Sequence, residues 1–412
     1  MKIVRSTKCS TKFTTKKKML ELNTILEEYG KVCNIFISYF WTHPEIDKTQ
    51  LLKPIVDLPM ANTWLSARLR KVAAREALDM VSSVKNVFEW NKEQVQSTIT
   101  ALEKKLTTVK HDTKNNRRKI NNWHKKHKSL TSKLSMMQPH KPKHKGDRMA
   151  ISCTIAELQV SKKQGEFDAW LHMASMGNGI TLDIPINYHK HFKELNNKSV
   201  RQNAYIVTKD YVQFSFERET GPKKEVKNII GIDTGINALA STSDKLQFGT
   251  DIKALIEKSK RCKSGSKGKQ RAINTIKQRM NEVAKEILKN KDLIVVEKLS
   301  NLNDKSKLKG RLSKNIRSSI GSWNYAYWLM RLEQLCEDNR ISFRTVSPYN
   351  TSITCPVCNL ADSRNRVGEV FKCQACGYTD NADINAALNI VQRFLTGKYG
   401  SCYKPKETQL ST

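Results

Sequence analysis

The sequence predicts a multidomain α+β protein. Its 412 residues are enough for two to three domains that bury their own cores. The hydrophobic pattern changes along the chain from helical spacing to alternation by two, and then to short apolar runs typical of buried strands. Two C-x-x-C pairs near the C-terminus add the signature of a small metal-stabilised domain.

The charge of the chain indicates a polyanionic partner. Lys and Arg number 73 against 39 Asp and Glu, which gives a formal net charge of +34. Such an excess repels itself in a compact fold unless phosphates neutralise it, so nucleic acid is the expected partner. A ribosome-like basic tail or a binder of anionic membranes is favoured less, because the positive charge runs along the whole chain.

Neither secretion nor membrane insertion is expected. The segment 1–6 lacks the apolar core of a signal peptide, and no apolar run reaches the roughly 18 residues that span a bilayer. Four of the ten cysteines form the two C-x-x-C pairs and the others are scattered. This usage suits a reducing cytosol, with one metal site and otherwise buried or incidental thiols.

The first third of the chain predicts one strand followed by helices. Residues 1–14 are typical of a short basic strand, and apolar residues recur at helical spacing from Thr15 to Phe36. A longer helical pattern runs over about 61–110, and the segment 103–148 is more basic still. There Trp123, His124 and His127 stand among arginines and lysines, which favours base stacking with phosphate binding over a merely solvated helix face.

Residues 150–227 predict a small antiparallel β domain. Strands are expected over 151–155, 179–185 and 211–217, where apolar residues alternate. We expect the first strand of the chain to join this domain, so that the helical block over about 15–130 is an insertion into it. The Gly-Pro pair and the lysines in 218–224 indicate a linker to the next domain.

Three carboxylates mark the C-terminal half. Asp233 ends the apolar run 229–232, Glu297 ends the run 293–296, and Asp383 lies in the first turn of a helix expected over 382–395. Each has an ordinary explanation, as a turn cap, an exposed strand end or a partner of the helix dipole. Together, acids at neighbouring strand ends and a helix start can converge on two divalent ions for phosphodiester hydrolysis.

The cysteine pairs predict a structural zinc site. The spacing Cys355-x-x-Cys358 and Cys373-x-x-Cys376 fits two knuckles around a tetrahedral ion. Two redox-active pairs are the alternative, which the paired spacing disfavours. The short apolar segment 370–372 before the second knuckle suits a zinc ribbon.

The order of these motifs resembles a known family. Gly-Ile-Asp-x-Gly, Val-Val-Glu-Lys-Leu, Ser-Trp at 322–323, Pro-x-x-Thr-Ser-x-x-Cys-x-x-Cys, Cys-x-x-Cys-Gly and Asp-x-Asn-Ala-Ala-x-Asn-Ile follow one another between residues 228 and 395. This series is similar to TnpB, the insertion-sequence nuclease related to compact type V CRISPR effectors. Upstream of residue 228 only the layout of strand, helical insertion and β domain is similar.

The resemblance implies a fold and a domain plan. It implies an RNase H-like RuvC nuclease domain with an inserted zinc ribbon, and a β-barrel wedge domain with an inserted helical recognition domain. The implied boundaries are 1–14 and 131–226 for the wedge, 15–130 for the recognition domain, 227–350 and 379–398 for RuvC, 351–378 for the nucleic-acid-binding ribbon, and 399–412 for a short tail.

The resemblance also implies site residues and partners. Asp233, Glu297 and Asp383 would bind Mg²⁺ or Mn²⁺, since the context of Asp383 fits the family motif better than that of Asp380. The four cysteines would bind Zn²⁺, and Arg366 is the nearest match to an arginine that assists the site in several relatives. The implied partners are a guide RNA and target double-stranded DNA, with one or two protein copies per RNA.

The leading hypothesis is therefore an RNA-guided DNA endonuclease. A guided DNA-binding repressor without cleavage is a second hypothesis, although all three acids are present. A guide-independent RuvC-type nuclease is a third, because a nuclease fold alone does not require a guide.

Overall fold

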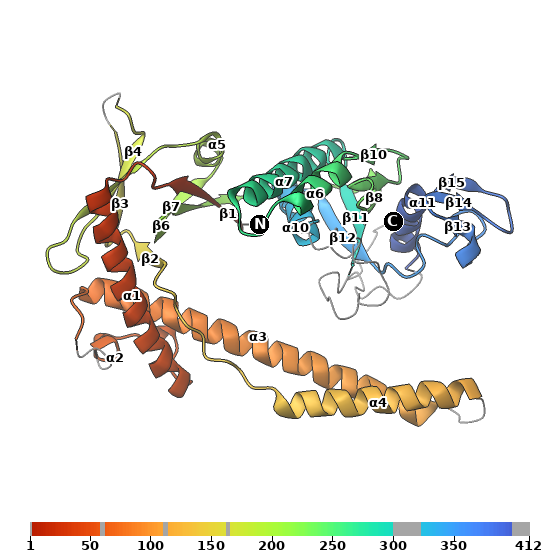
Figure 1. Ribbon diagram of the computed structural model, residues 1–412, viewed down its shortest axis with the longest axis horizontal. Coiled ribbons are helices and arrows are strands. Elements are labelled where there is room, and N and C mark those ends of the chain that lie inside the picture. The colour runs from red at the N-terminus through yellow and green to blue at the C-terminus, as the bar shows by residue number, and fades with distance from the viewer. Residues whose placement is uncertain (1, 58–61, 110–113, 162–164, 300–322, 398–412) are drawn as a thin grey trace. The chain divides into compact units, whose positions relative to one another are not determined.

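The computed structural model describes residues 2–57, 62–109, 114–161, 165–299 and 323–397 (Figure 1). The predicted tail, Ser322 of the Ser-Trp motif and Cys402 lie outside the described residues. The chain divides after Arg218 into two units. The N-terminal unit contains α1–α5 and β1–β7, and the C-terminal unit contains the elements from β8 onward.

The N-terminal unit is built on a four-stranded sheet in the order β1-β7-β6-β2. Its strands are β1 (Lys2–Ser10), β2 (Arg148–Ser152), β6 (Val200–Thr208) and β7 (Tyr211–Glu219). The first strand pairs with the last, as expected, so the helices between β1 and β2 are an insertion into this sheet.

A second sheet of the same unit has the order β3-β4-β5, with β3 (Ala156–Val160), β4 (Ala169–Met173) and β5 (Leu182–Ile186). Helix α5 (Lys190–Lys198) joins β5 to β6. In the described part of the unit no ladder joins the two sheets, so the barrel stays a prediction.

Two strand predictions need correction. The run expected over 151–155 is broken after β2, because the hydroxyls of Ser152 and Thr154 bond to each other and Ile155 N–H donates to the Ser152 carbonyl in a turn. The run expected from residue 179 starts only at β5, since Ile180 N–H donates to Gly177 O in a second turn. Alternation alone does not reveal such turns.

The helical insertion comprises α1 (Lys16–Thr42), the 3₁₀ turn η1 (Lys48–Gln50), α2 (Lys53–Asp57), α3 (Ala67–Thr108) and α4 (Lys114–Met136). Thr15 caps α1 and Ser66 caps α3 by accepting backbone N–H groups, so α3 begins later than its apolar pattern suggests. Helices α3 and α4 run side by side in opposite directions (Figure 1).

The C-terminal unit contains a five-stranded sheet in the order β10-β9-β8-β11-β12. Its strands are β8 (Ile229–Asp233), β9 (Ala240–Thr242), β10 (Gln247–Phe248), β11 (Leu293–Glu297) and β12 (Ser342–Val346). Strand β11 is parallel to β8 and β12, whereas β8 pairs antiparallel with β9 and β9 with β10. The buried runs ending at Asp233 and Glu297 are confirmed as strands.

Helices cover both faces of this sheet. On one face α6 (Ile252–Arg261), α7 (Lys267–Ile287) and α10 (Tyr325–Asp338) pack on Ile230, Ile232, Ile294 and Val296. On the other face α11 (Ala382–Thr396) packs through Ile390 against the alternate residues Leu293 and Val295. Strand periodicity therefore places Asp233 and Glu297 on the face that α11 covers.

The small ribbon comprises the 3₁₀ turn η2 (Ser363–Asn365) and a sheet in the order β13-β14-β15, with β13 (Arg366–Val367), β14 (Val370–Lys372) and β15 (Thr379–Asn381). Phe371 is fully buried there between the two cysteine loops. Across the described ranges, no helix combines the length and the apolar character needed to cross a membrane.

Candidate active site and zinc site

The three acids meet at one edge of the five-stranded sheet. The pairing of Ile232 with Val296 in the parallel β8–β11 ladder sets the adjoining Asp233 and Glu297 side by side. Asp383 enters from the first turn of α11, and its Oδ2 lies 4.0 Å from where a Cβ on Gly235 would stand. Parallel strands that end at the same edge, and a helix that starts there, thus gather the acids that the sequence predicted.

Burial and mutual repulsion perturb these carboxyls. Desolvation raises the pKa of Asp233 well above its ordinary value, and the charges of Glu297 and Asp383 raise it further. Desolvation also raises the pKa of Glu297, against the opposing effects of the Thr351 hydroxyl, Arg393 and Arg366. Acids that repel one another in this way form a site whose charge a cation would neutralise.

Arg366 reaches the acids from the ribbon. Its Nη2 lies 3.0 Å from Asp383 Oδ1, and its Nε donates to the Gly368 carbonyl at 3.0 Å. Its positive charge lowers the pKa of both Asp233 and Glu297. The structure therefore brings the predicted arginine into contact with one acid and within electrostatic range of the other two.

Side chains of helix α11 form hydrogen bonds with the chain segment that leads into the first cysteine knuckle. Three buried side chains spaced by four residues, Asn385, Asn389 and Arg393, form a stripe on this helix. The stripe donates to backbone carbonyls of residues 347, 351 and 354. From the sequence, the two asparagines were recognised only as part of a family motif. Their i, i+4 spacing was the signal that they share one face of the helix.

Thr351 forms a buried contact with Glu297 that the sequence did not predict. It is 4% exposed, and its hydroxyl donates to Glu297 Oε1, although the two residues are 54 positions apart. In the sequence Thr351 stood out only by its place in the motif before the first knuckle. No local pattern indicated that Glu297 would be its hydrogen-bond partner.

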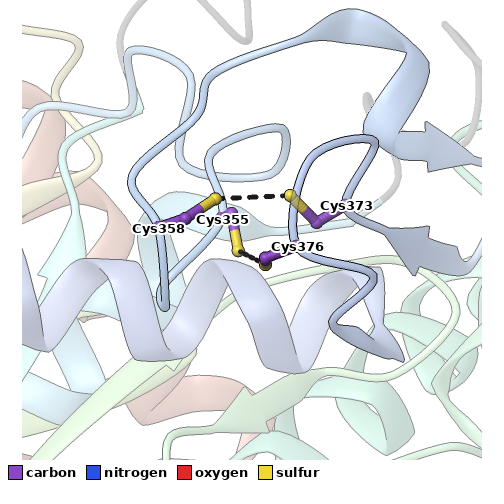
Figure 2. A group of neighbouring side chains, drawn as sticks. All are labelled: Cys355, Cys358, Cys373 and Cys376. Carbon is purple, nitrogen blue, oxygen red and sulfur yellow. Dashed lines mark hydrogen bonds between the residues drawn. The ribbon is translucent and has the colours of Figure 1, made fainter.

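The four cysteines point toward one another from two loops (Figure 2). Cys355 Sγ lies 3.5 Å from Cys376 Sγ, and Cys358 Sγ lies 3.4 Å from Cys373 Sγ. All four sulfurs lie within 4.8 Å of one another. Because a tetrahedral zinc with bonds of about 2.3 Å places its sulfurs about 3.8 Å apart, the cluster fits a structural zinc ion.

The loop geometry fits a zinc site as well. Backbone N–H groups of Cys376 and Ala375 point at the Cys373 sulfur and lower the pKa of this thiol to about 6. Such donors stabilise the thiolate, which is the form that binds zinc.

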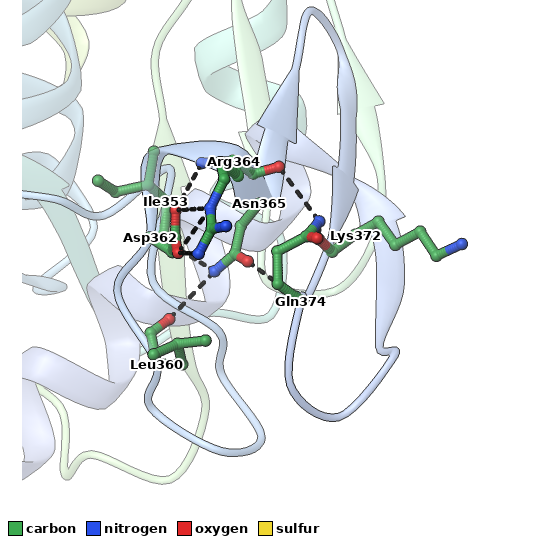
Figure 3. A network of polar contacts seen from close by, with 7 residues as sticks. All are labelled: Ile353, Leu360, Asp362, Arg364, Asn365, Lys372 and Gln374. Atoms are coloured by element: carbon green, nitrogen blue, oxygen red, sulfur yellow. Dashed lines mark hydrogen bonds and ion pairs between the residues drawn. The ribbon is translucent and has the colours of Figure 1, made fainter.

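Asn365 ties the two cysteine loops together (Figure 3). Its Nδ2 donates to the carbonyls of Ile353 at 3.0 Å and Leu360 at 3.2 Å, in the first loop, and its Oδ1 accepts Gln374 N–H at 2.9 Å, in the second. Beside it, Arg364 forms a fork with Asp362. This network fixes the backbone just before Arg366, so the ribbon and the acid site share one scaffold.

A second group of ligand-type side chains lies in the N-terminal unit. Cys33, Glu76 and His144 also have donor atoms within 4.8 Å of one another. However, Glu76 already accepts from Arg148 Nε at 3.0 Å and from the Tyr29 hydroxyl at 2.9 Å. The positive guanidinium of Arg148 already pairs with the Glu76 carboxylate and would repel a metal ion. We therefore interpret this group as a structural network.

The predicted stacking rings of α4 differ in exposure. His124 is exposed, Trp123 is half-buried, and His127 Nε2 lies 3.0 Å from Glu103 Oε1 on α3. His127 therefore helps to join the two helices, and base stacking by the other two rings stays a prediction.

Comparison with known proteins places the fold and site in context. A family model described as Cas12f1-like, TNB domain, matches residues 325–390, from α10 through the ribbon into α11. A CRISPR-associated endodeoxyribonuclease Cas12f1 of Sulfoacidibacillus thermotolerans is 43% identical over 82 residues, which are 18% of this chain and 19% of the relative. A TnpB-like protein of Aquifex aeolicus (strain VF5) is 32% identical over 120 residues, which are 28% and 37% of the two chains.

One solved structure shows the same fold at low identity. CasPhi-2 (Cas12j) bound to crRNA and phosphorothioate-DNA matches with a TM-score of 0.52 and 12% identity, over 96% of this chain and 92% of that one. The curated relatives are matched over 15% to 53% of their own lengths.

The fold and the site define an α+β protein in which a four-cysteine ribbon is inserted beside a cluster of acids. More particularly, residues 325–390 match the Cas12f1-like TNB domain, and the chain is similar over part of its length to Cas12f1 and TnpB-like proteins.

Proposed function

We propose that this chain is an RNA-guided DNA endonuclease that hydrolyses target DNA with divalent metal ions. The observation that carries the proposal is the convergence of Asp233, Glu297 and Asp383 from β8, β11 and α11, with Arg366 reaching Asp383 from the ribbon. A buried cluster of mutually repelling acids is costly unless cations neutralise it, which supports a metal-dependent role.

The three acids would hold Mg²⁺ or Mn²⁺, since carboxylate oxygens are the ligands these ions prefer. When bound, the ions supply the Lewis acidity that phosphodiester hydrolysis needs. Arg366 would hold Asp383 in place and bring positive charge toward the scissile phosphate.

The sheet order supports an RNase H-like nuclease domain. Numbered within the domain, the strands lie in the order 3-2-1-4-5, with the first, fourth and fifth parallel. We propose that residues 227–350 and 379–398 form this RuvC-like domain and that 351–378 form a nucleic-acid-binding zinc ribbon. The sheets and helices of the N-terminal unit would be the wedge and recognition domains.

A guide RNA would supply sequence specificity, while the protein would hold the RNA–DNA duplex by its backbone. The net charge of +34 and the basic helix α4, which has no acidic residue, support a large polyanionic partner. The relatives named as endodeoxyribonucleases, and the CasPhi-2 structure with crRNA and DNA, support the same function.

To test this, the chain is expressed with its native flanking DNA and the RNA that copurifies is sequenced. The purified complex is then incubated with Mg²⁺ and a plasmid that carries the matching target, and cutting of the plasmid is measured. Asp233→Ala should abolish cutting and leave RNA binding unchanged. Asp244→Ala is the matched control, because Asp244 pairs with Lys291 in the same unit but away from the site, and it should cut normally.

The outcomes separate three functions. A stoichiometric RNA with Asp233-dependent cutting supports the proposal. A specific RNA with target binding but no cutting by the wild-type protein would indicate a guided repressor. Cutting by RNA-free protein that survives RNase treatment would indicate a guide-independent nuclease instead.

A further inference from the structure

Thr351 connects the first cysteine loop to the acid site. The residue is buried at 4% exposure, and its acceptor Glu297 is 8% exposed. The hydroxyl has a single proton and two acceptors within reach, Glu297 Oε1 and the Pro348 carbonyl at 3.3 Å. A carboxylate is a stronger acceptor than a backbone carbonyl, so the Thr351 hydroxyl donates its hydrogen bond to Glu297.

The backbone of Thr351 is itself fixed by α11. Asn389 Nδ2 donates to the Thr351 carbonyl at 2.9 Å and to the Thr354 carbonyl at 2.7 Å. Asn385 Nδ2 adds a bond to the Thr354 carbonyl at 3.0 Å. Both amides are essentially buried, so water does not compete for these bonds.

The same helix carries the third acid. Asp383 lies six residues before Asn389 on α11, while Thr351 and Cys355 belong to the segment that the asparagines grip. A single continuous set of bonds therefore runs from α11 through the Thr351 carbonyl and hydroxyl to Glu297. It fixes the orientation of one acid relative to another.

We propose that Thr351 is a positioning residue, which holds one oxygen of Glu297 and thereby directs the other toward the divalent ions. Asn389 acts through Thr351 in the same way. Partners of this kind behind metal ligands are typically worth 10- to 100-fold in metal affinity or activity. The inference rests on the proposed function, because it assigns Glu297 to the metal site.

The test compares Thr351→Val, which removes the hydroxyl at nearly equal volume, with Thr351→Ser, which retains it. Mn²⁺ binding to the full chain is followed by the electron paramagnetic resonance of free Mn²⁺, alongside zinc content, melting temperature and the Mg²⁺ dependence of cleavage. Thr242→Val is the control, because it removes a fully buried hydroxyl from the same unit whose acceptor is the Leu246 carbonyl.

We expect Thr351→Val to weaken Mn²⁺ binding about 10- to 100-fold with unchanged zinc content. Thr351→Ser should restore binding and Thr242→Val should not affect it. Wild-type affinity in Thr351→Val, or equal losses in all three variants, overturns the inference. Asp233→Ala separates the two proposals: if the wild type shows no Asp233-dependent Mn²⁺ binding, the metal site itself is wrong and the inference falls with it.

Discussion

Gly231 offers a test of how tightly α11 must pack for the acids to meet. It lies in β8 between Ile230 and Ile232, on the face that α11 covers. A Cβ built on Gly231 would stand 2.4 Å from the Ala387 carbonyl oxygen and 2.7 Å from Val391 Cγ2, both on α11. Gly231→Ala therefore forces the helix and the strand apart.

The size of the displacement follows from these distances. Side-chain Cβ atoms essentially never come within 3.0 Å of another heavy atom, so α11 must move by at least about 0.6 Å. Overpacking of this kind costs about 1–3 kcal/mol. For a unit of this size each kcal/mol lowers the melting temperature by roughly 2–4 °C. Since α11 carries Asp383, and a misplacement of about 1 Å can cost about 100-fold in rate, a shift of this size should slow cleavage by roughly 10- to 100-fold.

Differential scanning calorimetry and single-turnover cleavage of matched DNA measure the two effects. Gly268→Ala is the control: its Cβ would meet Ser266 Oγ at 3.8 Å in the first turn of α7, and alanine favours a helix. This control should melt at or slightly above the wild-type temperature. A Gly231→Ala protein with wild-type melting and cleavage would refute the close packing of α11 on β8.

Two further predictions concern the zinc site and the buried network of the N-terminal unit. Cys373→Ser should lose zinc and cleavage together even in excess Mg²⁺, because the ribbon holds Arg366 at Asp383. Zinc analysis and plasmid cutting measure the two losses. Full cleavage by zinc-free protein would contradict the prediction. Burial alone would raise the pKa of Glu76, but contacts with His144, Tyr29 and Arg148 together lower it below its usual 4.5. This lowered pKa stabilises the fold above about pH 4.5, and the stabilisation is lost as the pH falls through the folded-state pKa. Glu76→Gln should remove that acid dependence and cost about 2 kcal/mol in urea unfolding near neutral pH, and an unchanged pH profile would exclude this role.

The sequence predicted the strands and helix that carry the acids because their signals are local. A short apolar run that ends in Asp233 or Glu297 is typical of a buried parallel strand, and the structure confirms both as strands. The cysteine quartet was equally readable, because two knuckles with short fixed spacing need few other residues to form a site.

Predictions failed where a turn interrupted a regular pattern. The bond between Ser152 and Thr154 breaks a run that alternates well enough for one strand. Small polar residues compete with the ladder for backbone partners, and alternation does not register this competition.

By itself the sequence indicated the candidate site residues, three acids and four cysteines on a strongly basic chain, and the family resemblance added one arginine. Only the tertiary structure decided what holds them. Glu297 and Thr351 are 54 residues apart, and Asn389 and Thr351 are 38 apart, yet each pair forms a buried hydrogen bond. Such contacts depend on how α11 packs on the sheet, and no local pattern in the chain encodes a distance between residues that far apart.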